Sequence, residues 1–521
     1  MVNSAVSFPK TTFNIIASDQ KVGFEPNRGL LFVQKTAAGS AQVGLNVNLP
    51  QTPAELDALF GPTSMGAFIA KQFRRINPWT FLDAIVFADS ASSPVAATAT
   101  VVFSGTATAA GSLLVSVASR AMHTFEIDVS VGDTAAVVAA ALVSAIGLGG
   151  SMPFTASVTS ATVTFTAANK GTHANTWPLI VTGSVPGITA TLTGFANGAT
   201  DPALTGAFDP IENLRYQHIV WPSTWSRTAL KTFMDSRKNV DNDILDGRVF
   251  IWEETDFATA LSDALTLNSS EMVLMTNKPN ALANWKGNHL GEAPDLCAAY
   301  FAGLRARRLE PGISISDIVA TNESLDQFGG PAMNSLPFFN SPFVGFQQPY
   351  PGTGYSQAEQ RELENGGVTV VGSNRSNTGI VCGAAVTTWQ FDVAGNPDDT
   401  WKYLEWRDTH GAIREYVVLN CRKRFSQYRL TGGEAIANRA MATQQMIAGY
   451  ILGLCVDLMD MTLIQKGQAA RQFIQDNMVV TLDLDARSAQ VTLVVPMVSQ
   501  LESILGTIKY TFDFGAQQVA A

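Results

Sequence analysis

Between residues 216 and 309 the sequence alternates three times between a short apolar run and a longer amphipathic stretch. The apolar runs are YQHIVWP, GRVFIWEE and EMVLMTN, and residues 224–238, 256–267 and 291–309 follow them with helical patterns. Strands that alternate with helices of this length need crossover connections, which make the strands parallel in one sheet. The alternation therefore predicts a mainly parallel α/β domain. The strand-like segments 28–35 and 78–89 precede it in the sequence.

The composition changes sharply between residues 94 and 200. The stretch is rich in Thr, Ala, Ser, Val and Gly, and its charged side chains are Arg120, Glu126, Asp128, Asp133 and Lys170. Residues 124–131 and 161–167 alternate apolar and polar side chains, which is typical of strands with one buried face. The stretch 132–147 between them predicts a helix capped by Asp133 and Gly147. We interpret residues 94–201 as a self-contained, β-rich inserted domain.

Residues 364–389, ENGGVTVVGSNRSNTGIVCGAAVTTW, predict two strands joined by a polar loop around Arg375. Small residues, hydroxyl groups and an arginine between strands are also compatible with a phosphate-binding loop. No helix follows this loop directly, so the pattern lacks the helix N-terminus that binds anions. We therefore interpret the loop as a hairpin turn whose arginine contacts a neighbouring molecule or solvent.

The end of the sequence carries two further patterns. Residues 433–465 have an apolar stripe at helical spacing, which predicts a helix packed in a core. The final run TIKYTFDF alternates apolar and polar side chains, and its apolar positions are Ile508, Tyr510, Phe512 and Phe514. Such a strand either pairs within its own chain or extends the sheet edge of a neighbouring molecule, and the pattern leaves both open.

Composition narrows the class of protein. The chain has 521 residues, 15% of them charged, with a formal net charge of −10. These values predict several ordered domains and argue against a dedicated nucleic-acid-binding protein. The four cysteines form no CxxC pair and predict buried thiols in a reducing compartment, without a disulfide or zinc framework. We see no signal-peptide pattern and no uninterrupted apolar span, and therefore expect a soluble protein made in the cytoplasm.

The densest run of positive charge is CRKRF, which contains Arg422, Lys423 and Arg424. Between residues 401 and 430, seven basic side chains stand against three acidic ones. A small basic patch on an acidic chain is an unusual nucleic-acid site. A protein partner with an acidic face is favoured, and an ordinary solvated surface is the alternative.

Signatures of common enzymes do not occur in the sequence, which has no P-loop, HExxH, GxSxG or strand-linked GxGxxG motif. Ligands of parallel α/β sheets bind at the carboxyl ends of the strands, where this sequence has Ser223, Glu253, Glu254 and Lys278. An α/β hydrolase or a phosphate-handling enzyme is therefore an alternative function.

A structural interpretation of the same strand ends is favoured. Thr224 and Asp256 stand where crossover loops need helix caps. Ser223, His289 and Asp256 could be drawn as a catalytic triad, but nothing in their spacing selects it. We predict that the chain is not an enzyme and has no catalytic, cofactor or metal site.

Three short motifs and two longer segments carry a resemblance to a known family. The motifs are NGG at 365–367, TTW at 387–389, and the helix start with Asp398, Asp399 and Trp401. The segments are LDALFGPTSMGAFIAKQFRRINP and the low-charge region that precedes the α/β part. In these features most of the chain resembles the tail sheath protein of contractile-tailed bacteriophages, in its Mu-like branch.

The resemblance implies a structural subunit of a contractile tail sheath. Such subunits stack as six-fold rings around a tail tube and contract to drive the tube through the bacterial envelope. The implied partners are further copies of the chain, the tail tube protein, and baseplate and tail terminator proteins, with no nucleic acid and no lipid insertion. The implied location is the virion tail, after assembly in the host cytoplasm. Another component of a contractile injection apparatus remains an alternative.

The resemblance and the patterns together predict a multidomain α/β and α+β fold with extended terminal arms. The predicted parts are an N-terminal arm (1–20), a central α/β domain of subtilisin-like topology (21–93 with 202–354), an inserted β-rich outer domain (94–201), a C-terminal α+β inner sheath domain (355–504) and a C-terminal arm (505–521). The resemblance also implies roles for single residues. Arg422, Lys423 and Arg424 would face the tube, Ile508, Tyr510, Phe512 and Phe514 would exchange strands between subunits, and Arg375 would make a contact at the hairpin tip.

Overall fold

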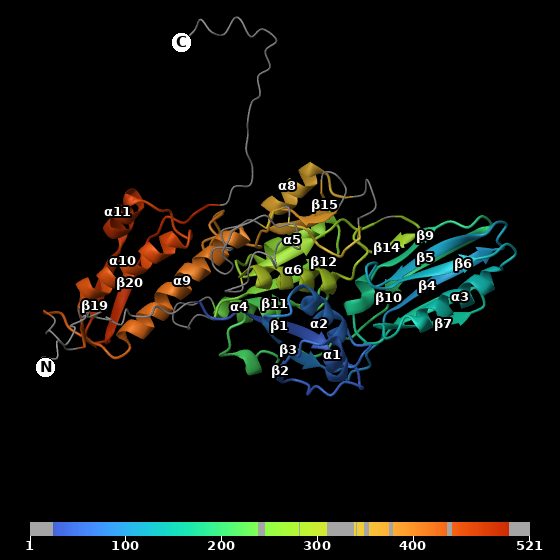
Figure 1. The fold of residues 1–521 in the computed structure, drawn as a ribbon, viewed down its shortest axis with the longest axis horizontal. Helices are drawn as coiled ribbons and strands as arrows, with labels where there is room; N and C mark the ends of the chain where they lie inside the picture. Colours follow the sequence, from blue (N-terminus) through green and yellow to red (C-terminus); the bar gives the residue numbers. More distant parts are fainter. Residues whose placement is uncertain are drawn as a thin grey trace, which may run out of the picture. The chain divides into compact units, whose positions relative to one another are not determined.

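The computed structural model describes residues 24–237, 245–280, 282–309, 338–339, 341–347, 354–374, 379–434 and 440–499. By contact these residues form two compact units (Figure 1). Unit 1 contains residues 24–25 and 410–497, and unit 2 runs from Pro26 to Thr409. The predicted terminal arms, 1–20 and 505–521, lie outside the described residues.

Unit 2 contains an eight-stranded sheet with the order β16-β15-β13-β12-β11-β1-β3-β2 (Figure 1). Its strands are β1 (Arg28–Gln34), β2 (Asn46–Asn48), β3 (Phe81–Phe87), β11 (His218–Val220), β12 (Arg248–Glu253), β13 (Met272–Thr276), β15 (Val368–Ser373) and β16 (Ile380–Cys382). The six inner strands are parallel, and the short edge strands β2 and β16 are antiparallel to their neighbours. The mixed α/β fold predicted from the sequence is confirmed.

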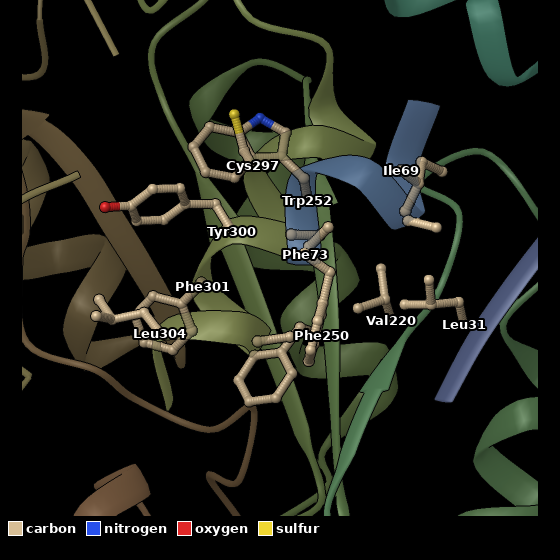
Figure 2. Packing of buried hydrophobic residues seen from close by; sticks show 14 of the residues in the cluster. Leu31, Ile69, Phe73, Val220, Phe250, Trp252, Cys297, Tyr300, Phe301 and Leu304 are labelled. Atoms are coloured by element: carbon tan, nitrogen blue, oxygen red, sulfur yellow. The ribbon is translucent and has the colours of Figure 1, made fainter. Parts of the chain in front are cut away.

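Helices cover both faces of this sheet. Five helices pack against the sheet: α2 (Met65–Ile76), α4 (Thr228–Ser236), α5 (Phe257–Leu267), α6 (Pro294–Leu309) and α8 (Gln357–Asn365). Helix α1 (Pro53–Phe60) packs next to α2. In β12, Phe250 and Trp252 pack with residues of α2 and α6, as Figure 2 shows, whereas Val249 and Ile251 pack with residues of α4 and α5. Burial on both faces explains why the parallel strands have continuous apolar sequences.

The region after β3 forms two four-stranded sheets with the orders β10-β4-β8-β7 and β14-β9-β5-β6. The strands are β4 (Thr98–Gly105), β5 (Gly111–Val117), β6 (Thr124–Val129), β7 (Phe154–Thr159), β8 (Thr162–Ala167), β9 (Leu179–Gly183), β10 (Ile188–Ala196) and β14 (Trp285–Lys286), with helix α3 (Ala135–Leu148) and the 3-10 turn η1 (His173–Thr176). One apolar cluster joins both sheets and α3, including Phe103, Phe165, Val115 and Leu142.

Two expectations for this region are wrong. The region is not self-contained, because Trp285 and Lys286, far beyond residue 201, pair with β9 and extend its sheet. The helix caps are also different: Thr134 is the N-cap of α3, whereas Asp133 accepts a hydrogen bond from the backbone N–H of Ser130. The α3 helix continues through residue 147 to a C-cap at Gly149.

Unit 1 packs the second part of α9 (Leu404–Phe425) against α10 (Gln444–Asp460), with α11 (Gln468–Asn477) and the short strands β17 (Arg429–Leu430), β18 (Met441–Ala442), β19 (Val479–Asp483) and β20 (Ser488–Thr492). Ile447, Ile451, Leu454 and Leu458 of α10 are buried, so the predicted apolar stripe is a core stripe. Within the described ranges, we find no helix with the length and apolar character to cross a membrane.

The boundary predicted at residue 355 differs from the division by contact. β15 pairs with β13, and β16 pairs with β15, so both belong to the eight-stranded sheet. The division falls between Thr409 and His410, inside α9. Sequence reasoning assigned the hairpin to the following region because its strands are adjacent in the chain, whereas the partner β13 is almost a hundred residues earlier.

Candidate functional sites

A cleft of about 640 Å³ lies at the carboxyl ends of β11 and β12. Ser223, Arg227, Glu253 and Asp263 are among its lining residues. Arg227 forms an ion pair with Glu253 and lies 3.6 Å from Asp263. Burial raises the pKa of Glu253, and the Arg227 guanidinium opposes that rise. Two carboxylates already contact this arginine, and Lys231, which also lines the cleft, is paired with Asp235 at 2.6 Å. Both cations are therefore engaged by carboxylates, whereas recognition of a phosphate uses a free one.

Lys278, the strand-end lysine that the alternative function as an enzyme would use, lies outside this cleft. Lys278 is not among the residues that line this cleft. Its Nζ is 3.5 Å from Glu359 Oε1 and 5.6 Å from the ring centroid of Tyr355. The structure therefore brings Ser223 and Glu253 to one cleft without Lys278.

The hydrogen bonds of a catalytic triad are missing at Ser223. Its Oγ is buried and forms no hydrogen bond to a histidine in the described part of the chain, whereas an activated serine needs a hydrogen bond to its base. Asp256 caps α5 by accepting from the N–H groups of Ala258 and Thr259, which confirms the cap interpretation. For Thr224 that interpretation is wrong, because α4 begins only at Thr228.

Residues of the inserted region contact the carboxyl end of β1, beside the crevice where open α/β sheets bind ligands. That crevice lies outside the carboxyl ends of the strands, where the strand order reverses. Here the reversal is at β1, from which the chain continues to β3 on one side and returns to β11 on the other. Asn169 of the inserted region donates hydrogen bonds to the Lys35 carbonyl and to Asp89, both at 2.9 Å. The Gln34 side chain donates to the Lys170 carbonyl at 2.8 Å. Residues 169–170 thus lie against the carboxyl end of β1.

A cluster of buried charges lies at the amino ends of β11, β12 and β13. Its members, which we call the buried charge network, are at most 6% exposed: Arg248, Arg305, Arg407, Asp246, Glu271, Asp408 and His218. Three arginines and three carboxylates balance one another. Sequence reasoning missed this network; the signal that could have indicated it is Arg248, an arginine inside the apolar strand RVFIWE.

The network fixes the first turn of α9 to the sheet. Arg305 of α6 binds Asp408 through two hydrogen bonds of 2.8 and 2.5 Å. Arg407 donates to Glu271 at 3.0 and 2.6 Å, and Arg248 also contacts Glu271. Arg305 donates to His218 Nδ1, and burial together with the nearby arginines lowers the pKa of His218 well below its usual value. The imidazole is therefore a neutral acceptor inside the network.

This burial corrects the count of charge around CRKRF. Arg407, Glu405 and Asp408 belong to the predicted basic region, yet all three are buried. The exposed basic residues of the last turn of α9 are Arg422 and Lys423, whereas Arg424 is partly buried with its guanidinium carbon 5.5 Å from the ring centroid of Tyr428. Without these three residues the region keeps six basic side chains against one acidic one, so their burial does not reduce its net positive charge. Arg375, Ile508, Tyr510, Phe512 and Phe514 lie outside the described residues, so their predicted roles stay predictions.

Strands β19 and β20 form a two-stranded hairpin, and neither outer edge pairs with another strand in the described chain. Val480 and Val491 are cross-strand partners on its inner face. Val480 is 3% exposed, but Val491 is 39% exposed. Isolated two-stranded hairpins are marginally stable, and a third strand with apolar residues facing α10 would cover the half-exposed valine.

Comparisons with known proteins show which class of protein the chain is similar to. The chain is similar to a bacteriophage-type tail sheath protein, namely the tail sheath protein of the Mu-like prophage FluMu of Haemophilus influenzae. The two sequences are 27% identical over 446 residues, which cover 82% of each protein. The resemblance to tail sheath proteins of the Mu-like branch, predicted from the motifs, is confirmed. No protein-family model matches the chain.

Solved structures of similar proteins are sheath proteins as well. The sheath tail protein of Listeria innocua aligns with a TM-score of 0.46 and 13% identity over 92% of this chain and 94% of that one. The sheath tail protein of Desulfitobacterium hafniense aligns with a TM-score of 0.45 and 10% identity, over 94% and 100%. The contracted helical sheath of the anti-feeding prophage gives 0.44 and 10%, over 98% and 100%.

Proposed function

We propose that the chain is a structural subunit of a contractile phage tail sheath, and that it is not an enzyme. The observation that carries this proposal is the relationship to the Mu-like prophage tail sheath protein over 82% of both chains. The contacts of residues 169–170 at the carboxyl end of β1, and a Ser223 Oγ without a hydrogen bond to a histidine in the described residues, are compatible with a role without catalysis.

The proposal also covers how the subunits assemble, which partners they contact and how the parts of the chain are oriented. Subunits stack as six-fold rings around a tail tube, and contraction drives the tube through the bacterial envelope. The partners are further copies, the tube protein, and baseplate and tail terminator proteins. Assembly takes place in the host cytoplasm and the product is the virion tail. The central sheet has a subtilisin-like topology, the inserted region faces outward, and α10 with its hairpin faces the tube.

Strand addition at the β19–β20 hairpin connects the subunits in this proposal. The open edge and the half-exposed Val491 favour an added strand whose apolar side chains point inward. The final run of the sequence supplies these side chains at Ile508, Tyr510, Phe512 and Phe514. A strand exchanged between neighbours keeps them linked while their bodies rotate.

We expect the purified full-length chain at high concentration to form hollow striated tubes or rings in electron micrographs. A chain that ends at residue 504 should stay soluble and folded but form neither, because the exchanged strand is gone. Circular dichroism and analytical ultracentrifugation check folding and assembly. Compact monomers of the full-length chain at every concentration would contradict the proposed function. Normal tubes from the shortened chain would contradict only the strand exchange.

The exposed basic residues at the end of α9 are proposed to contact an acidic face of the tube. Replacing both Arg422 and Lys423 by glutamate should weaken co-sedimentation with assembled tube protein about tenfold, the equivalent of about 1.4 kcal/mol, because like charges would then face each other. The matched control replaces the exposed Arg471 and Arg487 of the same unit by glutamate. An equal loss in both variants would show a general effect of net charge and no contact at this patch.

A further inference from the structure

A rigid loop in unit 2 presents one apolar side chain to solvent. Val393 lies in the loop between Phe391 and Pro397 and is fully exposed. Asn268 fastens the start of the loop by accepting hydrogen bonds from the N–H groups of Gln390 and Phe391 at 2.8 and 3.0 Å. Inside the loop, Asp392 accepts from the N–H groups of residues 394 and 396, both at 2.8 Å. A loop ordered in this way loses little conformational entropy when its tip binds a partner.

The same loop is acidic. Asp392, Asp398 and Asp399 lie within eight residues, and neither lysine nor arginine occurs between residues 379 and 401. Asp398 also accepts a hydrogen bond from Trp389 Nε1 at 3.0 Å, which fixes its position. We call residues 392–399 the acidic knob: an exposed valine flanked by three carboxylates.

A second surface of unit 2 has the opposite character. Trp79 and Phe81 are 48% and 57% exposed, which is unusual for large aromatic side chains. The Arg307 guanidinium carbon lies 5.5 Å from the ring centroid of Trp79, whereas its Nε is buried. Arg28 is the register partner of Phe81, its side chain is 41% exposed, and one of its nitrogens is 3.9 Å from Asp83. We call Arg28, Trp79, Phe81 and Arg307 the aromatic–arginine surface. Tryptophan and arginine are the residues that contribute most to protein interfaces.

Both surfaces lie on the side of the sheet where the parallel strands begin, but at different strands. The aromatic–arginine surface is at the amino ends of β1 and β3. The acidic knob is joined to the amino end of β13, where the N–H of Thr388 donates to the Met272 carbonyl. Three strands, β12, β11 and β1, separate β13 from β3, so the amino ends of β13 and β3 are roughly 19 Å apart at ordinary strand spacing. The surfaces therefore cannot meet within one chain.

We propose that the acidic knob of one copy docks on the aromatic–arginine surface of a second copy. The contact rests on the proposed function, because it is a contact between sheath subunits. Carboxylates would meet guanidinium groups at the rim, and Val393 would pack between the two exposed rings, as in interfaces with an apolar centre and a polar rim. Because the two halves are different patches of the same chain, the contact is heterologous. Repetition of such a contact builds a ring or an open helix, which a twofold contact cannot do.

Disulfide cross-linking between two variants that each add one cysteine to the four native ones, Val393→Cys and Phe81→Cys, tests the contact. Both positions are exposed, so neither change should disturb folding. After mild oxidation of the mixed full-length chains, we expect a cross-linked dimer as the major oxidised product, and little from either variant alone. The double variant should give a ladder of covalent oligomers. Leu148→Cys, at a site 90% exposed on α3, replaces Val393→Cys in the control mixture.

The products of this oxidation decide whether the proposed contact between copies forms. A dimer in the mixture and a ladder from the double variant support the docking. No cross-link in the mixture, or the same yield with Leu148→Cys, overturns it. A cross-linked dimer from Val393→Cys alone also overturns it, because the contact would then be twofold. Electron micrographs of the wild-type chain report on the proposed function separately: normal tubes without a mixed cross-link would leave that function standing and remove only this contact.

Discussion

Replacing Asp408 by alanine is expected to lower the free energy of unfolding of unit 2 by about 3–5 kcal/mol, the usual cost of removing one partner from a buried ion pair. Asp408 is 5% exposed and receives two hydrogen bonds from Arg305, and Arg248 Nε lies 3.2 Å from its Oδ1. Among the described residues, the substitution would leave the buried guanidinium of Arg305 hydrogen-bonded to His218 and to the Gln217 carbonyl alone. Thermal and denaturant unfolding, followed by tryptophan fluorescence, measure the effect.

Two further variants separate the buried charge from the loss of a side chain. Asp460→Ala breaks an ion pair with Lys466 in which both side chains are more than half exposed, and it should leave the melting temperature nearly unchanged. Arg305→Met combined with Asp408→Leu removes both charges and should be less destabilising than Asp408→Ala alone, because no unpaired arginine is buried. Equal melting temperatures for Asp408→Ala and Asp460→Ala would refute a structural role of the network.

The parallel sheet was predictable because its signal is local. GRVFIWEE and EMVLMTN are continuous apolar runs, which strands need when both faces are covered, and helical patterns of crossover length follow them. The helix cap at Asp256 is local in the same way, since its hydrogen bonds reach only two and three residues ahead. Patterns of this range are contained in single segments of sequence.

Contacts between distant segments were not predictable in this way. Arg305 and Asp408 are 103 residues apart, and Arg407 and Glu271 are 136 apart. In the sequence Arg407 therefore counted as surface charge next to CRKRF, although its partner Glu271 directly precedes β13. The two residues of β14 carry no strand pattern of their own, and their strand conformation depends on the edge of β9 that they meet. The two docking surfaces could not be predicted from the sequence either, because the exposure of Val393 and Trp79 depends on which distant segments pack around them.

Glu292 joins the central sheet domain to the inserted region, and its titration should make that junction sensitive to pH. The side chain is fully buried and accepts hydrogen bonds from Ser119 Oγ at 2.6 Å and from the N–H of Ala121 at 2.8 Å. Burial raises the pKa of Glu292 to about 8, against the opposing effects of these two donors and of the nearby Arg75 and Arg120. Below about pH 8, the protonated carboxyl of Glu292 is therefore the favoured form in the folded chain.

The sign of the effect follows from the direction of this shift. Because the pKa is higher in the folded chain than in the unfolded one, the stability contributed by the proton is complete below the ordinary glutamate value and is lost as the pH rises toward 8. Glu292→Gln cannot ionise. We expect it to match the wild type near pH 5 and to be more stable by about 2–4 kcal/mol near pH 8.

Denaturant midpoints of the wild type and of Glu292→Gln between pH 5 and pH 8.5 measure this difference. Burial also raises the pKa of Glu254 to about 8 and of Glu405 to about 7, so the wild type alone would report several carboxyl groups together. The difference between the two chains isolates Glu292. Glu126→Gln, the same chemical change on an exposed position of β6, should give no difference that varies with pH. A gap between wild type and Glu292→Gln that stays constant across this range would mean that Glu292 remains ionised in the folded chain, held by Ser119, Ala121 and the two arginines. The junction would then owe its stability to a buried anion and lose it on acidification, the opposite of the dependence expected here.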